Sequence, residues 1–178
     1  MLEGRVVRLR DLRPTDMVIF LGWRNDPEIS QYLSTPSVEP DELENWFGKG
    51  EGDTSATYMG IETATGQLIG YIGLREIDWT QRSAMLVIVI GEKNWWNQGL
   101  GEDAVNTLLD YAFSSLSLQK VSLSVLPFNT RAIRCYEKAG FRRVGFFGEY
   151  YFRQGRLWRP IHMEITADQF RVARRIKG

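Results

Sequence analysis

The sequence contains one cysteine and one histidine among its 178 residues. A single cysteine cannot form an internal disulfide, so the chain is not one of the small secreted proteins that disulfides stabilise. One histidine beside one cysteine disfavours a metal site built from those ligands, and it leaves few ways to form a Ser–His or Cys–His nucleophile pair. We therefore expect no metal cofactor.

Long apolar runs and an excess of one charge are also missing. The longest apolar run covers residues 84–90, far short of the ~20 residues of a membrane-spanning helix. The N-terminal sequence MLEGRVVRLRDL lacks the apolar segment of a signal peptide. Lys plus Arg and Asp plus Glu both number 22, which removes the electrostatic reason to expect nucleic-acid binding. These absences predict a cytoplasmic protein with neither a membrane nor a nucleic-acid partner.

The chain has enough apolar material for a substantial core. Apolar residues make up 43% of it and aromatic residues 12%, and its length is that of about one domain. We therefore expect a single domain over residues 1–178.

Apolar spacing predicts an α/β fold. Strands are expected over residues 5–10, 55–62, 67–76, 83–90, 120–126, 141–152 and 156–166. Helices are expected over residues 14–23, from 25 to Pro36, and over 40–47, 101–115, 129–139 and 167–177, with a loop at 48–53. The run at 83–90 predicts a strand buried on both faces. Hairpins followed by βαβ units indicate a mixed sheet with helices on its faces.

The segment IVIGEKNWWNQGLGEDA, residues 88–104, runs from a buried strand through a glycine-containing loop into a helix. The first turn of a helix carries unpaired N–H groups and partial positive charge, and glycines let an anion approach the main chain. This outline fits a pyrophosphate cradle, although an ordinary strand–helix turn fits the fragment equally well. No Gly-Lys-Ser/Thr follows, and Ala104 replaces the last glycine of a dinucleotide motif.

The segment PFNTRAIRCYEKAGFRRV, residues 127–144, opens a helix at Asn129 and carries Tyr136 two turns later. A spacing of seven residues places both side chains on one helix face. Taken alone, Asn129 is an N-cap and Tyr136 a half-buried aromatic residue.

Together, the two segments resemble the GNAT superfamily of acyl-CoA-dependent N-acyltransferases. The matching features are IGEKNWWNQGLGEDA, the N-x-x-A-x-x-x-Y of NTRAIRCY, and the following YEKAGFRRVG. Within the superfamily, VRLRDLRPTD and WRNDPEI look most like ribosomal-protein N-terminal acetyltransferases and their small-molecule relatives. The resemblance implies a GNAT fold, a mixed and mostly antiparallel sheet of about seven strands with helices on both faces.

The resemblance also implies roles for individual residues. The strand residues Ile88, Val89 and Ile90 would bind pantetheine, Asn129 the cofactor arm, and Tyr136 would protonate the departing CoA thiolate. A strand N–H near Ile90 would polarise the thioester carbonyl. The phosphate loop would consist of Trp96, Asn97, Gln98, Gly99, Leu100 and Gly101. Trp96 stands where the superfamily usually has Gln or Arg, so the loop amides are expected to hold the pyrophosphate.

The acceptor side is less defined by the sequence. Arg24, Asp26, Glu76 and Glu149 are candidates for contacting the substrate. The strand over 84–90 lacks the carboxylate that many relatives use as general base, which leaves Glu76, Asp78, Glu92, Glu149 and His162 open, along with a water chain or an amine that arrives neutral. Cys135 has no histidine near it in sequence and is interpreted as a small apolar residue rather than a nucleophile.

These features predict an N-acetyltransferase that moves acetyl from acetyl-CoA directly to a primary amine. The acceptor classes left open are a protein N-terminus and a small amine such as a polyamine, an amino sugar or an aminoglycoside. A non-catalytic acyl-CoA binding or sensing module is the alternative, and an ordinary nucleotide-binding domain is a third interpretation. The resemblance suggests a homodimer.

Overall fold

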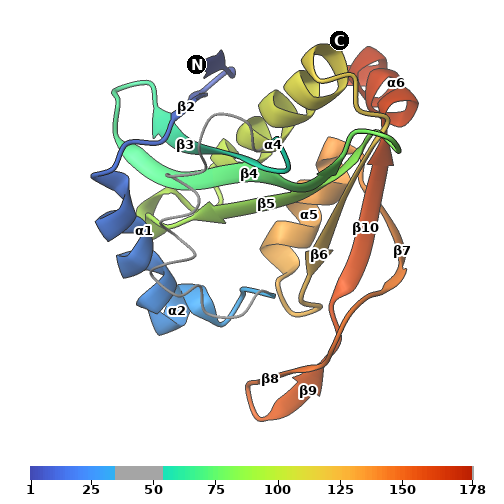
Figure 1. Ribbon diagram of the computed structural model, residues 1–178. Helices are drawn as coiled ribbons and strands as arrows, with labels where there is room; N and C mark the ends of the chain where they lie inside the picture. Colours follow the sequence, from blue (N-terminus) through green and yellow to red (C-terminus); the bar gives the residue numbers. More distant parts are fainter. Residues whose placement is uncertain (35–53, 178) are drawn as a thin grey trace.

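The computed structural model describes residues 1–34 and 54–177. Its main feature is an eight-stranded sheet in the order β1-β2-β3-β4-β5-β6-β10-β7 (Figure 1). The first five strands are β1 (Leu2–Glu3), β2 (Val7–Asp11), β3 (Thr57–Thr63), β4 (Leu68–Asp78) and β5 (Ser83–Ile90). The others are β6 (Lys120–Val125), β10 (Ile161–Thr166) and the edge strand β7 (Arg142–Phe146).

Every neighbouring pair of strands is antiparallel except β5 and β6, which are parallel. The predicted mixed, mostly antiparallel sheet is therefore confirmed. It has eight strands rather than about seven because the short β1 pairs with β2 at the edge.

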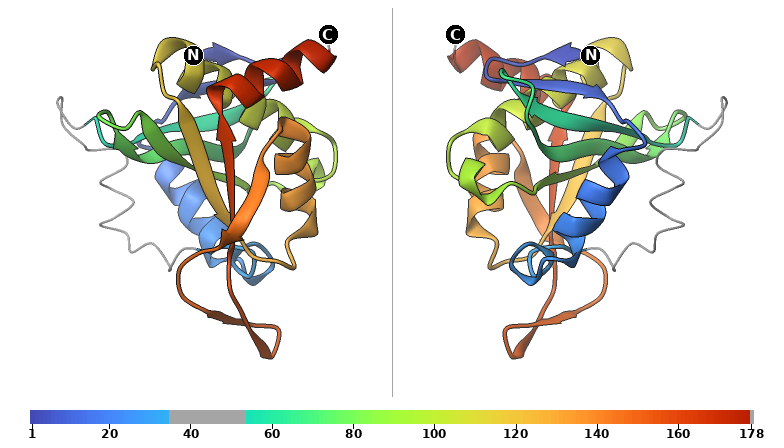
Figure 2. Two further views of the ribbon diagram at one scale, coloured as in Figure 1. Left: turned by 90° about the vertical axis from the view of Figure 1, so that its right-hand side faces the viewer. Right: turned by 90° about the vertical axis from the view of Figure 1, so that its left-hand side faces the viewer.

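Helices cover both faces of the sheet, as predicted (Figure 2). Helices α1 (Asp16–Asn25) and α2 (Pro27–Ser30) pack on one face through a cluster containing Phe20, Tyr71 and Val89. Helix α4 (Leu100–Asp110) and the π-helical turn η2 (Tyr111–Ser115) occupy the other face, with α5 (Thr130–Ala139) and α6 (Ala167–Lys177). Five apolar residues at helical spacing on α4 and η2 are all fully buried: Ala104, Val105, Leu108, Leu109 and Ala112.

Two buried carboxylates fasten the N-terminal segment to the sheet and helices. Asp103 in α4 accepts hydrogen bonds from the main-chain amides of Arg5, Val6 and Val7, at 3.1, 2.8 and 3.0 Å. Asp16 forms a two-point ion pair with Arg10, with N–O distances of 2.7 and 3.0 Å. Because both carboxylates are satisfied, neither is left as a costly unpaired buried charge.

The C-terminal strands differ from the sequence prediction. The strand expected over 141–152 stops at Phe146, and β8 (Tyr151–Arg153) pairs only with β9 (Arg156–Trp158) in a separate two-stranded sheet. Gly148 takes a left-handed φ of +77°, and Pro160 has no N–H to donate to a ladder. The chain therefore leaves the main sheet as a hairpin arm that projects from the body (Figure 1).

Other boundaries also shift. Helix α2 has four residues rather than reaching toward Pro36. The helix predicted over 40–47 and the loop predicted over 48–53 lie outside the described residues. Between residues 54 and 177, and in the first 34, no helix has the length and apolar character needed to cross a membrane.

Candidate functional site

A V-shaped opening between β5 and β6 forms the centre of the site. The two strands pair only from Ser83 to Met85 and from Lys120 to Ser122, and they then diverge (Figure 1). A cavity of about 720 Å³ fills the opening, lined by residues of β5, β6, α2, α5 and the loop after β5. The apex of the V is thus at Met85 and Ser122.

Strand β5 is not buried on both faces, which corrects the sequence prediction. Ala84, Leu86 and Val89 are buried, whereas Met85, Val87, Ile88 and Ile90 are only half-buried. All of β5 from Met85 to Ile90 lines the cavity. The run is apolar throughout because one side of the strand packs in the core and the other faces a binding space.

The loop between β5 and α4 has the backbone of an anion cradle. After the short 3-10 helix η1 (Lys93–Trp95), Asn97 and Gly99 both take left-handed φ angles, +60° and +81°. Helix α4 then starts at Leu100, and its first turn, whose amides have no acceptor within the helix, lines the cavity. A methyl group at Gly101 would meet other protein atoms no closer than 3.8 Å, so the packing leaves room in front of this residue for a ligand.

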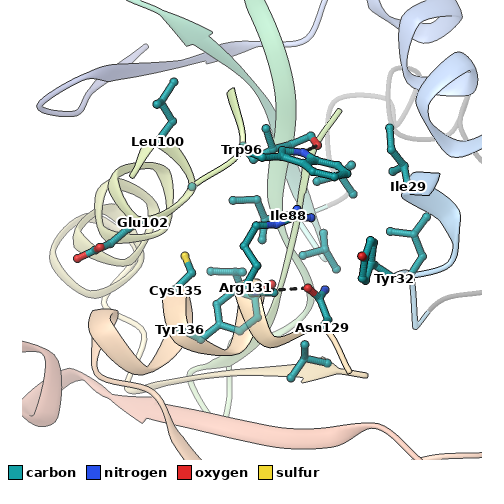
Figure 3. A pocket seen from close by; sticks show the side chains of 18 of the residues that line it. Ile29, Tyr32, Ile88, Trp96, Leu100, Glu102, Asn129, Arg131, Cys135 and Tyr136 are labelled. Carbon is teal, nitrogen blue, oxygen red and sulfur yellow. Dashed lines mark hydrogen bonds between the residues drawn. The ribbon is translucent and has the colours of Figure 1, made fainter. Parts of the chain in front are cut away.

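Trp96, in the loop after η1, lines the cavity and is held in place by the end of strand β5. Its indole Nε1 donates a hydrogen bond of 2.8 Å to the carbonyl of Ile90. The Arg131 guanidinium, which extends from α5, lies 3.7 Å from the centroid of the Trp96 ring and 5.4 Å from that of Tyr32 (Figure 3). Side chains from α5, from the loop after β5 and from the chain after α2 therefore meet over the opening.

Asn129 and Tyr136 lie where the helical spacing predicts, on α5 and lining the cavity. Asn129 Oδ1 accepts a 3.3 Å hydrogen bond from the amide of Ala132, so the N-cap prediction is confirmed. Tyr136 is 8% exposed, and its ring packs edge-on against Phe141. Burial raises the pKa of the Tyr136 phenol, with a further contribution from Cys135, so the phenol keeps its proton at neutral pH.

Cys135 also lines the cavity, beside Glu102 and Lys138. Burial raises the pKa of its thiol to about 12. The thiolate needed for nucleophilic attack is therefore scarce at neutral pH, in line with its interpretation as an apolar residue. Among the described residues, no three His, Cys, Asp or Glu side chains form a group able to hold a metal ion.

Of the four candidate acceptor residues, two line a described cavity and two do not. Arg24 lines the cavity and donates a 2.8 Å hydrogen bond to the phenol of Tyr71. Glu76 lies in a second, smaller cavity at the apex of the V. Asp26 instead caps α2 and forms an ion pair of 2.7 Å with Lys93, and the exposed Glu149 lines neither described cavity.

Three candidates for the general base interact with other residues of the protein. Asp78 accepts hydrogen bonds from the amides of a turn at Thr80 and Gln81. Glu92 accepts a 3.0 Å hydrogen bond from the indole of Trp23. His162 Nε2 is 3.1 Å from Glu164 Oε1, and its ring packs on Phe147.

The sequence reasoning missed Arg131 as a cavity residue. A cation in the first turn of a helix opposes the helix dipole, and Arg131 stands there, directly after Asn129 and Thr130. That unfavourable position is the sequence signal that would have marked it. With Arg134 and Lys138 it makes the α5 side of the cavity positively charged.

Comparisons with known proteins agree with this geometry. Residues 7–142 match the family model described as an acetyltransferase (GNAT) domain. The spermidine N(1)-acetyltransferase of Vibrio cholerae is 33% identical over 163 residues, which cover 91% of this chain and 94% of that enzyme.

Two solved structures are also similar. The Vibrio cholerae spermidine N-acetyltransferase in complex with CoA and spermine has a TM-score of 0.82 at 31% identity, over 92% of this chain and 97% of that one. A dodecameric structure of that enzyme in an intermediate state has a TM-score of 0.77 at 30% identity, over 92% and 95% of the two chains. These matches do not single out the ribosomal-protein branch, which stays a prediction.

Proposed function

The chain belongs to the GNAT acetyltransferase family and is an acetyl-CoA-dependent N-acetyltransferase, and on that premise we propose that it acetylates a primary amine of the polyamine class. The observation that carries the proposal is one continuous cavity that runs from the glycine loop at 99–101 to the Tyr136 phenol. The Vibrio cholerae relative, which is named for spermidine and was solved in complex with CoA and spermine, supports the acceptor class.

We propose that one end of this cavity binds the CoA diphosphate, whereas the other end carries the acid that assists acetyl transfer. At one end, the amides of Gly99 to Gly101 and the cations of α5 hold the diphosphate of CoA. Along β5, main-chain groups pair with the pantetheine amides as a peptide pairs with a sheet edge. At the other end, the protonated Tyr136 donates to the CoA thiolate as the carbon–sulfur bond breaks.

The assay is thiol release from acetyl-CoA in the presence of spermidine, spermine, an aminoglycoside, an amino sugar or a peptide N-terminus. We expect turnover with the polyamines, and Tyr136→Phe should lower kcat by ~10²-fold while acetyl-CoA still binds. A wild-type chain that binds acetyl-CoA and acetylates none of these amines would refute the proposal in favour of a binding or sensing module.

We also propose that the chain assembles with copies of itself, in units at least as large as the predicted dimer. Edge strand β7 and the hairpin arm expose large apolar side chains. The arm carries Tyr150, Phe152 and Leu157, between 62% and 64% exposed. Light scattering across a dilution series checks this, and a monomer at every concentration contradicts it. The cytoplasmic location stays a prediction.

A further inference from the structure

A second cavity, of about 250 Å³, adjoins the apex of the V. It shares four residues with the main cavity, namely Ser34, Arg75, Met85 and Ser124. Its remaining described lining comes from Glu76 and from the segment around the hairpin arm, with Phe147, Gly148, Tyr151 and Pro160. A group bound here therefore reaches the end of the main cavity where β5 and β6 separate.

Glu76 owes its position to a bulge in β4. Arg75 pairs with Met85 and Asp78 with Ser83, so Glu76 and Ile77 together face the single residue Ala84. Glu76 takes a left-handed φ of +51°, a conformation that costs free energy for any residue other than glycine.

The bulge changes which residue of β4 points into the core. Ile72 and Leu74 are fully buried. If the strand kept its regular period of two, the next side chain on that face would be Glu76, and its carboxylate would lie in the same core. With the extra residue, Ile77 fills the core position at 9% exposure, and the Glu76 side chain is 65% exposed at the cavity. The strained backbone thus delivers a carboxylate to the cavity and an isoleucine to the core.

Among the described residues, the charged neighbour of this carboxylate is Arg75, whose Nε lies 3.9 Å from Glu76 Oε1. The Arg75 Nε is buried, and none of the described residues accepts a hydrogen bond from it. The other titratable group lining this cavity, among the described residues, is the phenol of Tyr151 on β8. Of the five carboxylate and imidazole candidates named from the sequence, Glu76 is the one that lines a described cavity.

We propose that Glu76 is the residue that binds the acceptor's ammonium group and takes its proton. This assignment rests on the proposed function. An ammonium reaching the apex gives one proton to the Glu76 carboxylate, which passes it to solvent through the open side of the cavity. The neutral nitrogen then attacks the thioester carbonyl carbon, and the carbon–sulfur bond breaks. Tyr136 gives its proton to the thiolate, and the nitrogen's second proton then restores the Tyr136 phenol. The net products are the acetamide, CoA thiol and one released proton.

The first test is Glu76→Gln, measured as kcat/KM for spermidine across pH. Without the base, only amine that is already neutral reacts, and an alkylammonium has a pKa near ~10.4. We expect kcat/KM to fall by ~10²-fold near pH 7 and the deficit to shrink as pH rises toward 10, while KM for acetyl-CoA stays unchanged. Glu76→Asp should restore part of the rate.

Glu3→Gln is the matched control. Glu3 is 63% exposed and pairs with the neighbouring-strand Arg8 at 3.1 Å, so it resembles Glu76 in exposure and in having an arginine partner, but it lines neither described cavity. We expect it to keep wild-type kcat/KM at every pH.

A second variant separates the chemical role from a structural one. Glu76→Gly removes the carboxylate and relieves the left-handed strain, so its Tm should equal or exceed that of the wild type while kcat/KM drops as in Glu76→Gln. A Glu76→Gln enzyme with wild-type rate and pH profile, or a Glu76→Gly enzyme with wild-type rate, would overturn the assignment while the proposed function stands. A wild type inactive on every amine would instead remove the proposed function, and this inference with it.

Discussion

Replacing Arg131 by methionine tests how the cavity holds the cofactor's diphosphate. The guanidinium carbon of Arg131 lies over the Trp96 ring, 3.7 Å from its centroid, and the N–H donors of a guanidinium lie in the plane of the group, where a phosphate can accept from them. Trp96 stands where the family usually has a polar side chain. We therefore expect Arg131, stacked on that indole, to supply the charge that the loop lacks.

The magnitude follows from the contact that methionine cannot make. A hydrogen bond to a charged group contributes ~1.5–3 kcal/mol, and 1.36 kcal/mol is about tenfold in an equilibrium constant. Arg131→Met should therefore raise the Kd for CoA by roughly ten- to a hundredfold in a calorimetric titration. The uncharged stem of methionine still covers Trp96, so the Tm should change little.

Arg156→Met provides the control, because Arg156 lies 4.0 Å from the centroid of the Trp158 ring in the hairpin arm and lines neither described cavity. It removes a stacked guanidinium of the same kind and should leave the Kd for CoA unchanged. Wild-type affinity in Arg131→Met, or an equal loss in Arg156→Met, would refute the reasoning.

Three further predictions concern the scaffold. Gly99→Ala and Gly66→Ala impose an alanine on similar left-handed backbones, φ +81° and +83°, so both should lose ~1–2 kcal/mol of stability in urea, but only the first should weaken CoA binding. Gly91→Ala should lower the Tm, because its methyl group would lie 1.9 Å from the Trp23 indole, whereas Gly22→Ala, in open space within α1, should add ~0.5–1 kcal/mol. Burial favours a raised pKa for Asp16, but the hydrogen bonds from Arg10 and the Arg13 amide outweigh it and lower the pKa overall. The stability that this carboxylate contributes is then present above the ordinary Asp value of ~3.9 and is lost as pH falls through the lowered native value, so Asp16→Asn should flatten the acid limb of a plot of urea midpoint against pH.

The elements with one buried face were predictable from the sequence. Helix α4 follows its apolar spacing, and α5 begins after its predicted cap, Asn129, and ends at Ala139 as predicted, with Gly140 as its C-cap. In both helices the local signals and the burial pattern agree, so residue type alone fixes the element and the face it buries. Helical spacing placed Asn129 and Tyr136 on one face of α5, and the resemblance to the GNAT superfamily implied that this face meets the cofactor; both residues line the cavity.

The hairpin arm shows why the C-terminal boundaries failed. Residues 141–152 have the aromatic and β-branched character of one long strand, although Gly148 within them takes a left-handed φ of +77°. They are divided because pairing with β10 ends at Phe146, whose partner, Ile161, is the first residue of β10. A pairing limit of this kind is set by a segment some fifteen residues away, which periodicity within one strand does not record.

The cavity is built from places where regular structure is interrupted. Strands β5 and β6 stop pairing after Met85 and Ser122, which leaves main-chain groups of both strands facing the space between them. Left-handed φ angles at Asn97 and Gly99 turn the loop so that the start of α4 meets the cavity, and the bulge at Glu76 moves a carboxylate from the core side to the cavity side. Each interruption costs conformational or pairing free energy that the regular helices and sheet must offset. Sequence periodicity therefore predicts the scaffold that supplies this stability, whereas the residues at the interruptions become visible as a site only once the strands are placed beside one another.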